Sequence, residues 1–125
     1  MKPKYKRIML KLSGEVLLGK RISGIDHGVL EVLCKEILDV HKMGIDIVVV
    51  IGGGNIWRYH DFKETGIERV TSDNIGMLAT IMNAVAMQSM FEKLGAQCRV
   101  ASAIDIPQLA EPYLRRKVIR HLEKG

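Results

Sequence analysis

The feature that most constrains this chain is an apolar run that ends in three glycines. Residues 47–51 read Ile-Val-Val-Val-Ile, and Gly52, Gly53, Gly54 and Asn55 follow at once. Such a β-branched run is typical of a strand buried on both faces, as in a parallel sheet. Consecutive glycines cost backbone entropy, so a fold retains them where side chains do not fit. At the carboxyl end of a parallel strand, the usual reason is a ligand lying against bare backbone N–H groups.

A second strand end of this kind lies near the N-terminus. Residues 8–12 predict a strand that carries Lys11, and Ser13 and Gly14 follow it directly. A tight turn alone also explains a Ser-Gly pair. However, two strand ends that open into small-residue turns, with Lys11 and Arg58 beside them, indicate a phosphorylated ligand.

The rest of the chain alternates between strand and helix patterns. We predict strands at 5–12, 45–51 and about 97–103, and helices at 26–43, about 72–94 and about 113–124. Asp26 is expected to cap the first helix and Gly44 to end it. The order β-α-β-α-β-α favours a parallel sheet with right-handed crossovers. We therefore expect an α/β fold with three layers, α/β/α, and a mainly parallel sheet.

The helix expected at about 72–94 is apolar nearly all round. Its apolar residues include Met77, Met82, Met87 and Met90. A helix of this kind must be buried nearly all round, and three strands cannot achieve that. It lies inside a larger domain, or packs against another subunit, or is a core helix with no interface role. The methionines suit an adaptable apolar interface.

Length and composition limit the class of protein. The 125 residues are enough for one domain with a core, and no apolar run approaches the ~20 residues of a membrane span. We expect no signal peptide and a cytoplasmic protein, in which Cys34 and Cys98 are reduced, buried thiols. The four histidines lack ligand spacing, and we expect no protein metal site.

The net charge of +5 is unevenly placed, because basic residues crowd positions 2–11 and 115–124. Aromatic residues make up only 5% of the chain, so platforms for base stacking are absent. A solvated basic helix face and a basic N-terminus therefore explain the charge better than nucleic acid does.

Several motifs together resemble bacterial uridylate kinases (UMP kinases), of the amino-acid kinase superfamily. They are residues 11–15 (KLSGE), 52–55 (GGGN), 57–58 (WR) and 72–83 (SDNIGMLATIMN), and the likeness continues through 102–104 and 111–116. Family chains are about twice this length. Their second half carries most of the nucleoside-triphosphate pocket, a catalytic aspartate and a threonine-rich loop. The resemblance therefore implies that residues 1–125 are the N-terminal half of a truncated amino-acid kinase domain. This half would carry the UMP-binding side and part of the phosphate-binding site.

The resemblance also implies a role for each motif. Lys11 would contact the transferring phosphoryl group as the catalytic residue. The ATP-binding set would be Lys11, Leu12, Ser13, Gly14, Gly54 and Arg58, and the UMP-binding set Gly53 and Asp73. The residues alone also allow interpretations without a functional role. Lys11 is then a solvated lysine and Arg58 a surface arginine. Asp73 is then an acid in the first turn of its helix, where the helix dipole favours it.

The implied reaction transfers the γ-phosphoryl group of Mg-ATP to UMP, giving UDP and ADP for pyrimidine nucleotide biosynthesis. No protein ligand for Mg²⁺ is identified. The resemblance implies a homohexamer with GTP as activator and UTP as inhibitor. The GTP site would use Gly19, Lys20, Arg21, Ile22, Ser23, Gly24 and Arg99, although Gln88 replaces an arginine common in members with a well-formed effector site.

Two rival interpretations remain. The first is another amino-acid kinase, such as one acting on N-acetylglutamate, since such kinases carry similar glycine loops; residues 73–80 argue against it. The second is a non-catalytic fragment that survives only by packing against a full-length subunit.

Overall fold

Two parallel strands form the centre of the structure, a computed structural model that describes residues 2–125. Strands β1 (Arg7–Leu12) and β2 (Asp46–Ile51) pair in register from Arg7 opposite Asp46 to Leu12 opposite Ile51. Helix α1 (His27–His41) connects them, as a parallel pair requires. Both predicted strands are confirmed.

Helix α1 forms where its cap and its apolar spacing place it. The Asp26 carboxylate accepts a hydrogen bond from Val29 N at 3.0 Å, so the predicted cap is confirmed. Leu30, Cys34 and Ile37 recur at helical spacing and are buried. Gly44 follows the helix in the left-handed region, with φ of 88°, which a side chain rarely adopts.

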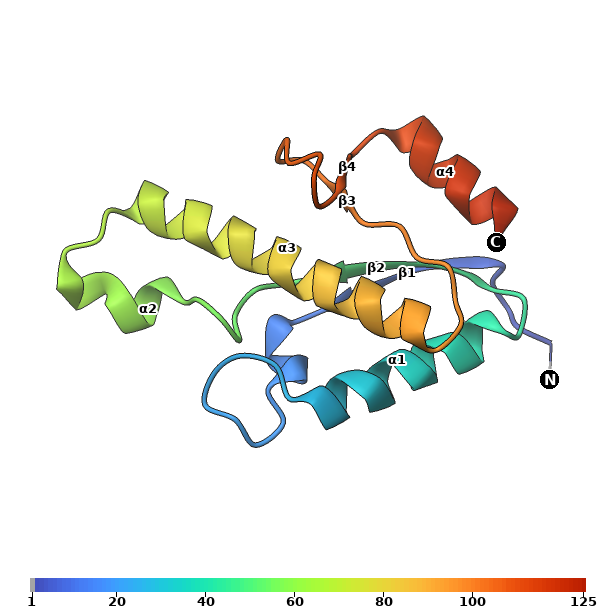
Figure 1. Cartoon of the computed structure of the whole chain (residues 1–125), viewed down its shortest axis with the longest axis horizontal. Coiled ribbons are helices and arrows are strands. Elements are labelled where there is room, and N and C mark those ends of the chain that lie inside the picture. The colour runs from blue at the N-terminus through green and yellow to red at the C-terminus, as the bar shows by residue number, and fades with distance from the viewer. Residues whose placement is uncertain (1) are drawn as a thin grey trace.

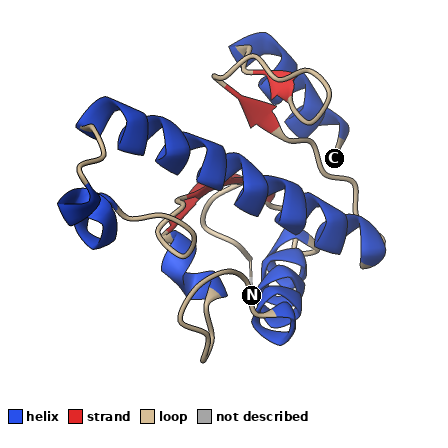
Figure 2. Cartoon of the chain, turned by 60° about the vertical axis from the view of Figure 1, so that its left-hand side comes forward, coloured by secondary structure: helices blue, strands red, loops and turns tan. Residues whose placement is uncertain are grey.

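One face of the two-stranded sheet is covered by α1 and by the long helix α3 (Arg69–Lys93) (Figures 1 and 2). The core consists of Leu17, Leu30, Cys34, Ile37, Leu38, Ile51, Met87, Met90 and Phe91. A third layer is only partly present. Helix α4 (Arg115–Lys124) contacts β2, but on the opposite sheet face Met9 is 71% exposed and Val50 is 42% exposed.

The prediction of a third strand at about 97–103 is wrong in the length of the strand and in the strand with which it pairs. Only Ala101–Ser102 is extended, as β3, and it pairs in parallel with β4 (Glu111–Pro112) in a second two-stranded sheet. The Ser102 hydroxyl accepts from Ile104 N at 3.0 Å, which turns the chain out of the strand. We did not predict β4, because a proline is a poor strand signal.

The long helix begins at Arg69, earlier than the predicted start at about 72. Ser72 does not cap it. Ser72 is the fourth residue of the helix and is 2% exposed, and its hydroxyl accepts from Trp57 Nε1 at 2.8 Å. Met77, Leu78 and Met82 are 46%, 47% and 58% exposed, so this chain by itself does not bury the helix all round, in keeping with the expectation that its strands could not.

The loop before α3 holds short helical turns that we did not predict. These are α2 (Tyr59–Phe62) and the 3₁₀ turn η2 (Lys63–Thr65), while another 3₁₀ turn, η1 (Gly14–Leu17), follows β1. The rings of Trp57 and Phe62 stack at 3.9 Å. This stacking fixes the loop that carries Arg58.

Both cysteines are free, as predicted, although Cys98 is only partly buried. Burial raises the pKa of each thiol to about 11, because an apolar environment disfavours the thiolate. None of the helices among residues 2–125 has the length and apolar character needed to cross a bilayer.

Candidate phosphate-binding site

The glycine turn after β2 lies directly against the turn after β1. Gly52 N donates to Leu12 O at 2.9 Å, so the two strand ends are joined. A side-chain Cβ at Gly14 would lie 2.5 Å from Asn55 Oδ1, 2.7 Å from Gly52 O and 2.9 Å from Gly54 N. Gly14 is therefore required by close packing of the two turns. The two places singled out in the sequence form one structural unit.

The N–H groups of this unit are available to a ligand. Those of Gly14, Gly53 and Gly54 donate to no acceptor among the described residues. Unpaired N–H groups in a folded protein require water or a ligand as acceptor. Neighbouring N–H groups of this kind form an anion-binding concavity.

Gly53 also packs against the long helix. A Cβ there would lie 2.8 Å from Ala79 Cβ and 3.0 Å from Gly76 O. Gly52, Gly53 and Gly54 all have negative φ, so these positions require glycine because of close packing and not because of a strained backbone. The close contact holds the glycine turn on α3.

We predict that Gly53→Ala destabilises the protein, whereas Gly76→Ala stabilises it. Alanine at 53 meets helix backbone and should cost about 1–3 kcal/mol of unfolding free energy. Gly76 has open space around its Cβ position and lies in a helix interior, where alanine should gain about 0.5–1 kcal/mol. Urea denaturation of both variants checks this. Equal stability of the two variants would contradict the packing.

A buried pair of amide side chains, for which we predicted no role, holds the glycine turn from inside. Asn83 is fully buried and Asn55 is 3% exposed. Their side chains exchange two hydrogen bonds, at 3.1 and 2.7 Å, while Asn83 Nδ2 donates to Gly52 O at 2.7 Å and Asn55 Nδ2 to Gly24 O at 2.9 Å. Asn83 in an otherwise apolar helix was the available signal, because a buried amide needs partners.

The two basic residues of the predicted site differ in how they are held. Lys11 is exposed and forms no ion pair within residues 2–125. Arg58 forms an ion pair with Glu15 and donates from Nε to Gly54 O at 3.2 Å. Glu15, to which no role was assigned, therefore orients Arg58 beside the glycine turn. Lys11 keeps its ammonium group free for an anion.

Asp73 does not lie in the first turn of its helix. It is the fifth residue of α3, and it accepts from Arg69 Nε at 3.2 Å. The helix-dipole alternative required a place in the first turn, and the earlier helix start removes it. The pair is exposed, and the Arg69 guanidinium also lies over the Tyr59 ring at 4.4 Å.

Comparison with known proteins places this geometry in a family. Residues 6–125 match the amino acid kinase family. The chain belongs to that family. It is 50% identical over 122 residues to the uridylate kinase of Pediococcus pentosaceus, an alignment that covers 98% of this chain and 51% of the relative. The predicted resemblance to uridylate kinases is thereby confirmed.

Solved structures of amino acid kinases agree with the sequence match. The UMP kinase of Bacillus anthracis superposes with a TM-score of 0.92 at 39% identity, covering 97% of this chain and 50% of that one. The UMP kinase of Ureaplasma parvum superposes with a TM-score of 0.89 at 33% identity, covering 98% and 52%. The predicted α/β fold with parallel strands is confirmed. The chain spans about half the length of these relatives.

The residues expected to bind GTP lie in two separate regions of this amino acid kinase chain. The loop of residues 19–24 lies between η1 and the N-terminal end of α1, whereas the segment before β3 follows the C-terminal end of α3 (Figure 1). Within the loop, Ile22 is fully exposed and Arg21 Nε donates to Ser23 O at 3.0 Å. Arg99 instead pairs with Glu111 at 3.7 Å. Among residues 2–125, no hydrogen bond or ion pair joins the two parts.

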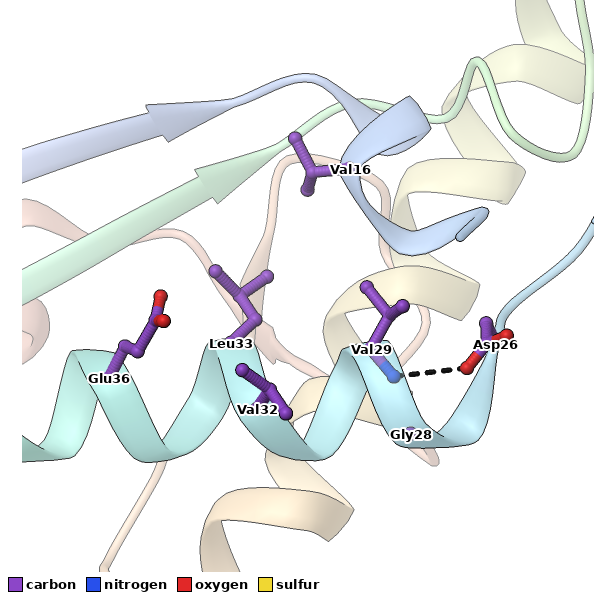
Figure 3. Close-up of a pocket in the computed structure, with 7 residues that line it drawn as sticks. All are labelled: Val16, Asp26, Gly28, Val29, Val32, Leu33 and Glu36. Atoms are coloured by element: carbon purple, nitrogen blue, oxygen red, sulfur yellow. Dashed lines mark hydrogen bonds between the residues drawn. The ribbon is translucent and has the colours of Figure 1, made fainter. Parts of the chain in front are cut away.

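A hollow of about 540 Å³ between η1 and α1 is separate from the glycine turns (Figure 3). Val16, Val29, Val32 and Leu33 line it together with Gly28 and the acids Asp26 and Glu36. It has no basic lining residue, and the Asp26 carboxylate caps α1. This hollow does not suit a phosphate.

Proposed function

We propose that this chain is the UMP-binding half of a UMP kinase, which transfers the γ-phosphoryl group of Mg-ATP to UMP. The observation that carries the proposal is the joined pair of turns beside Arg58, whose N–H groups at Gly14, Gly53 and Gly54 have no acceptor among residues 2–125. Such a concavity suits phosphate oxygens. The names of the relatives, uridylate kinase and UMP kinase, supply the acceptor.

The proposed roles follow from what phosphoryl transfer needs. The reaction forms no covalent intermediate with the protein, so catalysis consists of positioning and of neutralising charge. Ser13, Gly14 and Gly54 would hold the ATP phosphates through N–H groups, together with Leu12 and Arg58. The free ammonium group of Lys11 would follow the negative charge that moves between donor and acceptor.

The UMP side would use Gly53 and Asp73. The carboxylate of Asp73 can accept hydrogen bonds from ribose hydroxyls. Mg²⁺ would enter as part of the substrate Mg-ATP.

A fusion protein tests the proposed function. Residues 1–125 would be fused to the second half of the Pediococcus pentosaceus uridylate kinase, and UDP formation followed in a coupled assay. We expect phosphorylation of UMP and none of N-acetylglutamate. A fusion that circular dichroism shows to be folded, yet which makes no UDP or prefers N-acetylglutamate, would overturn the proposal.

In this fused protein, Asp73→Asn should raise the Michaelis constant for UMP with little change in turnover. The reason is that Asp73 would bind UMP equally in the ground and transition states. Loss of its exposed pair with Arg69 should cost only about 0.3–0.5 kcal/mol of stability.

Glu31→Gln is the matched control, because Glu31 forms a similar exposed pair with Lys35 on α1. It should leave the Michaelis constant for UMP unchanged. If Asp73→Asn changed only the melting temperature, as Glu31→Gln does, Asp73 would have no role in UMP binding.

We also propose that the complete protein is a homo-oligomer, a hexamer in keeping with its resemblance to uridylate kinases. The exposed apolar stripe of Met77, Leu78 and Met82 on α3 supports a subunit interface. A GTP site made from the 19–24 loop of one subunit and Arg99 of another would require such assembly, and UTP would act as the inhibitor. The free thiols of Cys34 and Cys98 fit a reducing compartment such as the cytoplasm.

A further inference from the structure

Asn83 binds the carbonyl oxygen of the first glycine in the turn after β2. This fully buried amide lies on α3, on the helix face that also carries Gly76 and Ala79, and its Nδ2 donates to Gly52 O at 2.7 Å. A peptide unit is planar and trans, so its C=O and N–H groups point in opposite directions. The bond to Gly52 O therefore directs the N–H of Gly53 away from Asn83.

The next peptide unit of the turn is held by different groups. Gly53 O accepts from Ile56 N and from Trp57 N, each at 3.0 Å, and these bonds direct the N–H of Gly54 in the same way. Among residues 2–125, Gly52 O is the only backbone atom to which Asn83 donates from its side chain. The influence of Asn83 on the turn is therefore concentrated on one N–H group, that of Gly53.

Asn55 fixes the orientation of the Asn83 amide. The two side chains exchange hydrogen bonds at 3.1 and 2.7 Å, and Asn55 Nδ2 also donates to Gly24 O at 2.9 Å. Because Gly52 O and Gly24 O can only accept, each amide must turn its Nδ2 toward one of them, and all four N–H groups of the pair find acceptors. A buried polar network that is fully satisfied in this way is rigid.

The same network reaches the loop of residues 19–24. Gly24 N donates to Asn55 O at 2.8 Å, so two hydrogen bonds join Gly24 to Asn55. Gly24 has φ of 86°, in the left-handed region that favours glycine. Among residues 2–125, the other hydrogen bonds of this loop stay within residues 18–24. The loop is therefore bonded to the glycine turn through Asn55.

We propose that Asn83 is a positioning residue, which aims the N–H of Gly53 at a phosphate oxygen of the acceptor nucleotide, and that Asn55 ties this aim to Gly24. The proposal rests on the proposed function, in which Gly53 contacts UMP. Apolar side chains would fill the space between α3 and the turn with no polar group to satisfy, but they would leave Gly52 O without a donor. What the buried amides supply is the direction of the N–H group.

The first test needs no enzyme activity. Inorganic phosphate would be titrated into the ¹⁵N-labelled 125-residue chain, and the amide chemical shifts followed by NMR spectroscopy. We expect Gly53 and Gly14 to shift in the parent, and only Gly53 to lose its response in Asn83→Leu, which retains the size of the side chain without its donors. In a folded Asn83→Leu protein, loss of both responses or of neither would overturn the proposal, as would a parent in which Gly53 does not respond.

The second test measures kinetics in the fused protein. Asn83→Leu should raise the Michaelis constant for UMP by about tenfold or more, the effect of losing one hydrogen bond to a charged group. The Michaelis constant for ATP should change by less than about twofold, whereas a merely structural role would move both constants together. Ile37→Ala, in the core on α1, is the control, because it should lower the melting temperature and leave both constants unchanged. Equal rises of both constants in Asn83→Leu would overturn the proposal.

A matched pair of glycines tests the link to the loop, and it decides the proposal if Asn83→Leu does not fold. Gly24 and Gly44 have φ of 86° and 88°, so alanine strains both positions alike. A Cβ at Gly24 would come no closer than 3.6 Å to another residue, the side chain of Arg21, and a Cβ at Gly44 would have open space. Only Gly24→Ala should raise the Michaelis constant for UMP, by about threefold or more. Equal constants in the two variants would overturn the proposal.

Failure of the positioning role and failure of the proposed function give different results. A folded fusion protein that makes no UDP would overturn the proposed function, while selective loss of the Gly53 response to phosphate in Asn83→Leu would still support positioning of an anion. Formation of UDP by the parent, with the same Michaelis constant for UMP in Asn83→Leu, would overturn the positioning role alone.

Discussion

Alone, the 125-residue chain is expected to form no UDP from UMP and Mg-ATP above the blank. Holding two reactants together in the right geometry contributes about 7–11 kcal/mol to a reaction of this kind, or about 10⁵-fold or more in rate. The chain spans about half the length of its relatives, and among residues 2–125 the outer edge of β2 pairs with no further strand. Under the proposed function, it would present only one side of a two-substrate site.

A coupled assay on purified chain checks this expectation. The host's own UMP kinase is the main contaminant, so a Lys11→Ala preparation purified in the same way serves as the blank. Activity of the original chain near that of the fused protein, absent from the Lys11→Ala blank, would show that this half is sufficient.

The second large effect is expected from Lys11→Ala in the fused protein. Its turnover number should fall by about 10²-fold to 10³-fold, because removal of one group that stabilises transition-state charge has this effect in other enzymes. The Michaelis constant for UMP should change little, since Lys11 would act on charge that develops only as the phosphoryl group moves. Lys11 is exposed and unpaired within residues 2–125, so the fold should not depend on it.

Two further variants make this measurement specific. Lys6→Ala removes an exposed lysine just before β1 and should leave turnover unchanged. Lys11→Arg retains the charge but replaces a compact ammonium group with a planar fork, so its turnover should lie between those of Lys11→Ala and the parent. A normal turnover number in a folded Lys11→Ala protein would show that Lys11 is a solvated lysine with no role in catalysis.

Sequence patterns correctly predicted the helices and strands that depend on interactions between residues close together in the chain. The β-branched run of β2, the Asp26 cap of α1 and the apolar spacing of Leu30, Cys34 and Ile37 each depend on residues close in sequence, and each was confirmed. The helix start at Arg69 was missed because Ser72 resembles a cap. Its hydroxyl is bound by Trp57, fifteen residues away, which no local pattern reveals.

The sequence by itself determined the family, the parallel strand pair and the two small-residue turns, because glycines after a buried strand have few physical explanations. Only the tertiary structure decided what each glycine contacts: Gly14 meets Asn55, and Gly53 meets α3. It alone paired Asn55 with Asn83 and Glu15 with Arg58. It also replaced the expected third strand of one sheet with a separate pair, β3 and β4, and left the edge of β2 open. The physical reason is that such contacts join residues far apart in the chain, so the path of the whole backbone, and not local preference, brings them within reach.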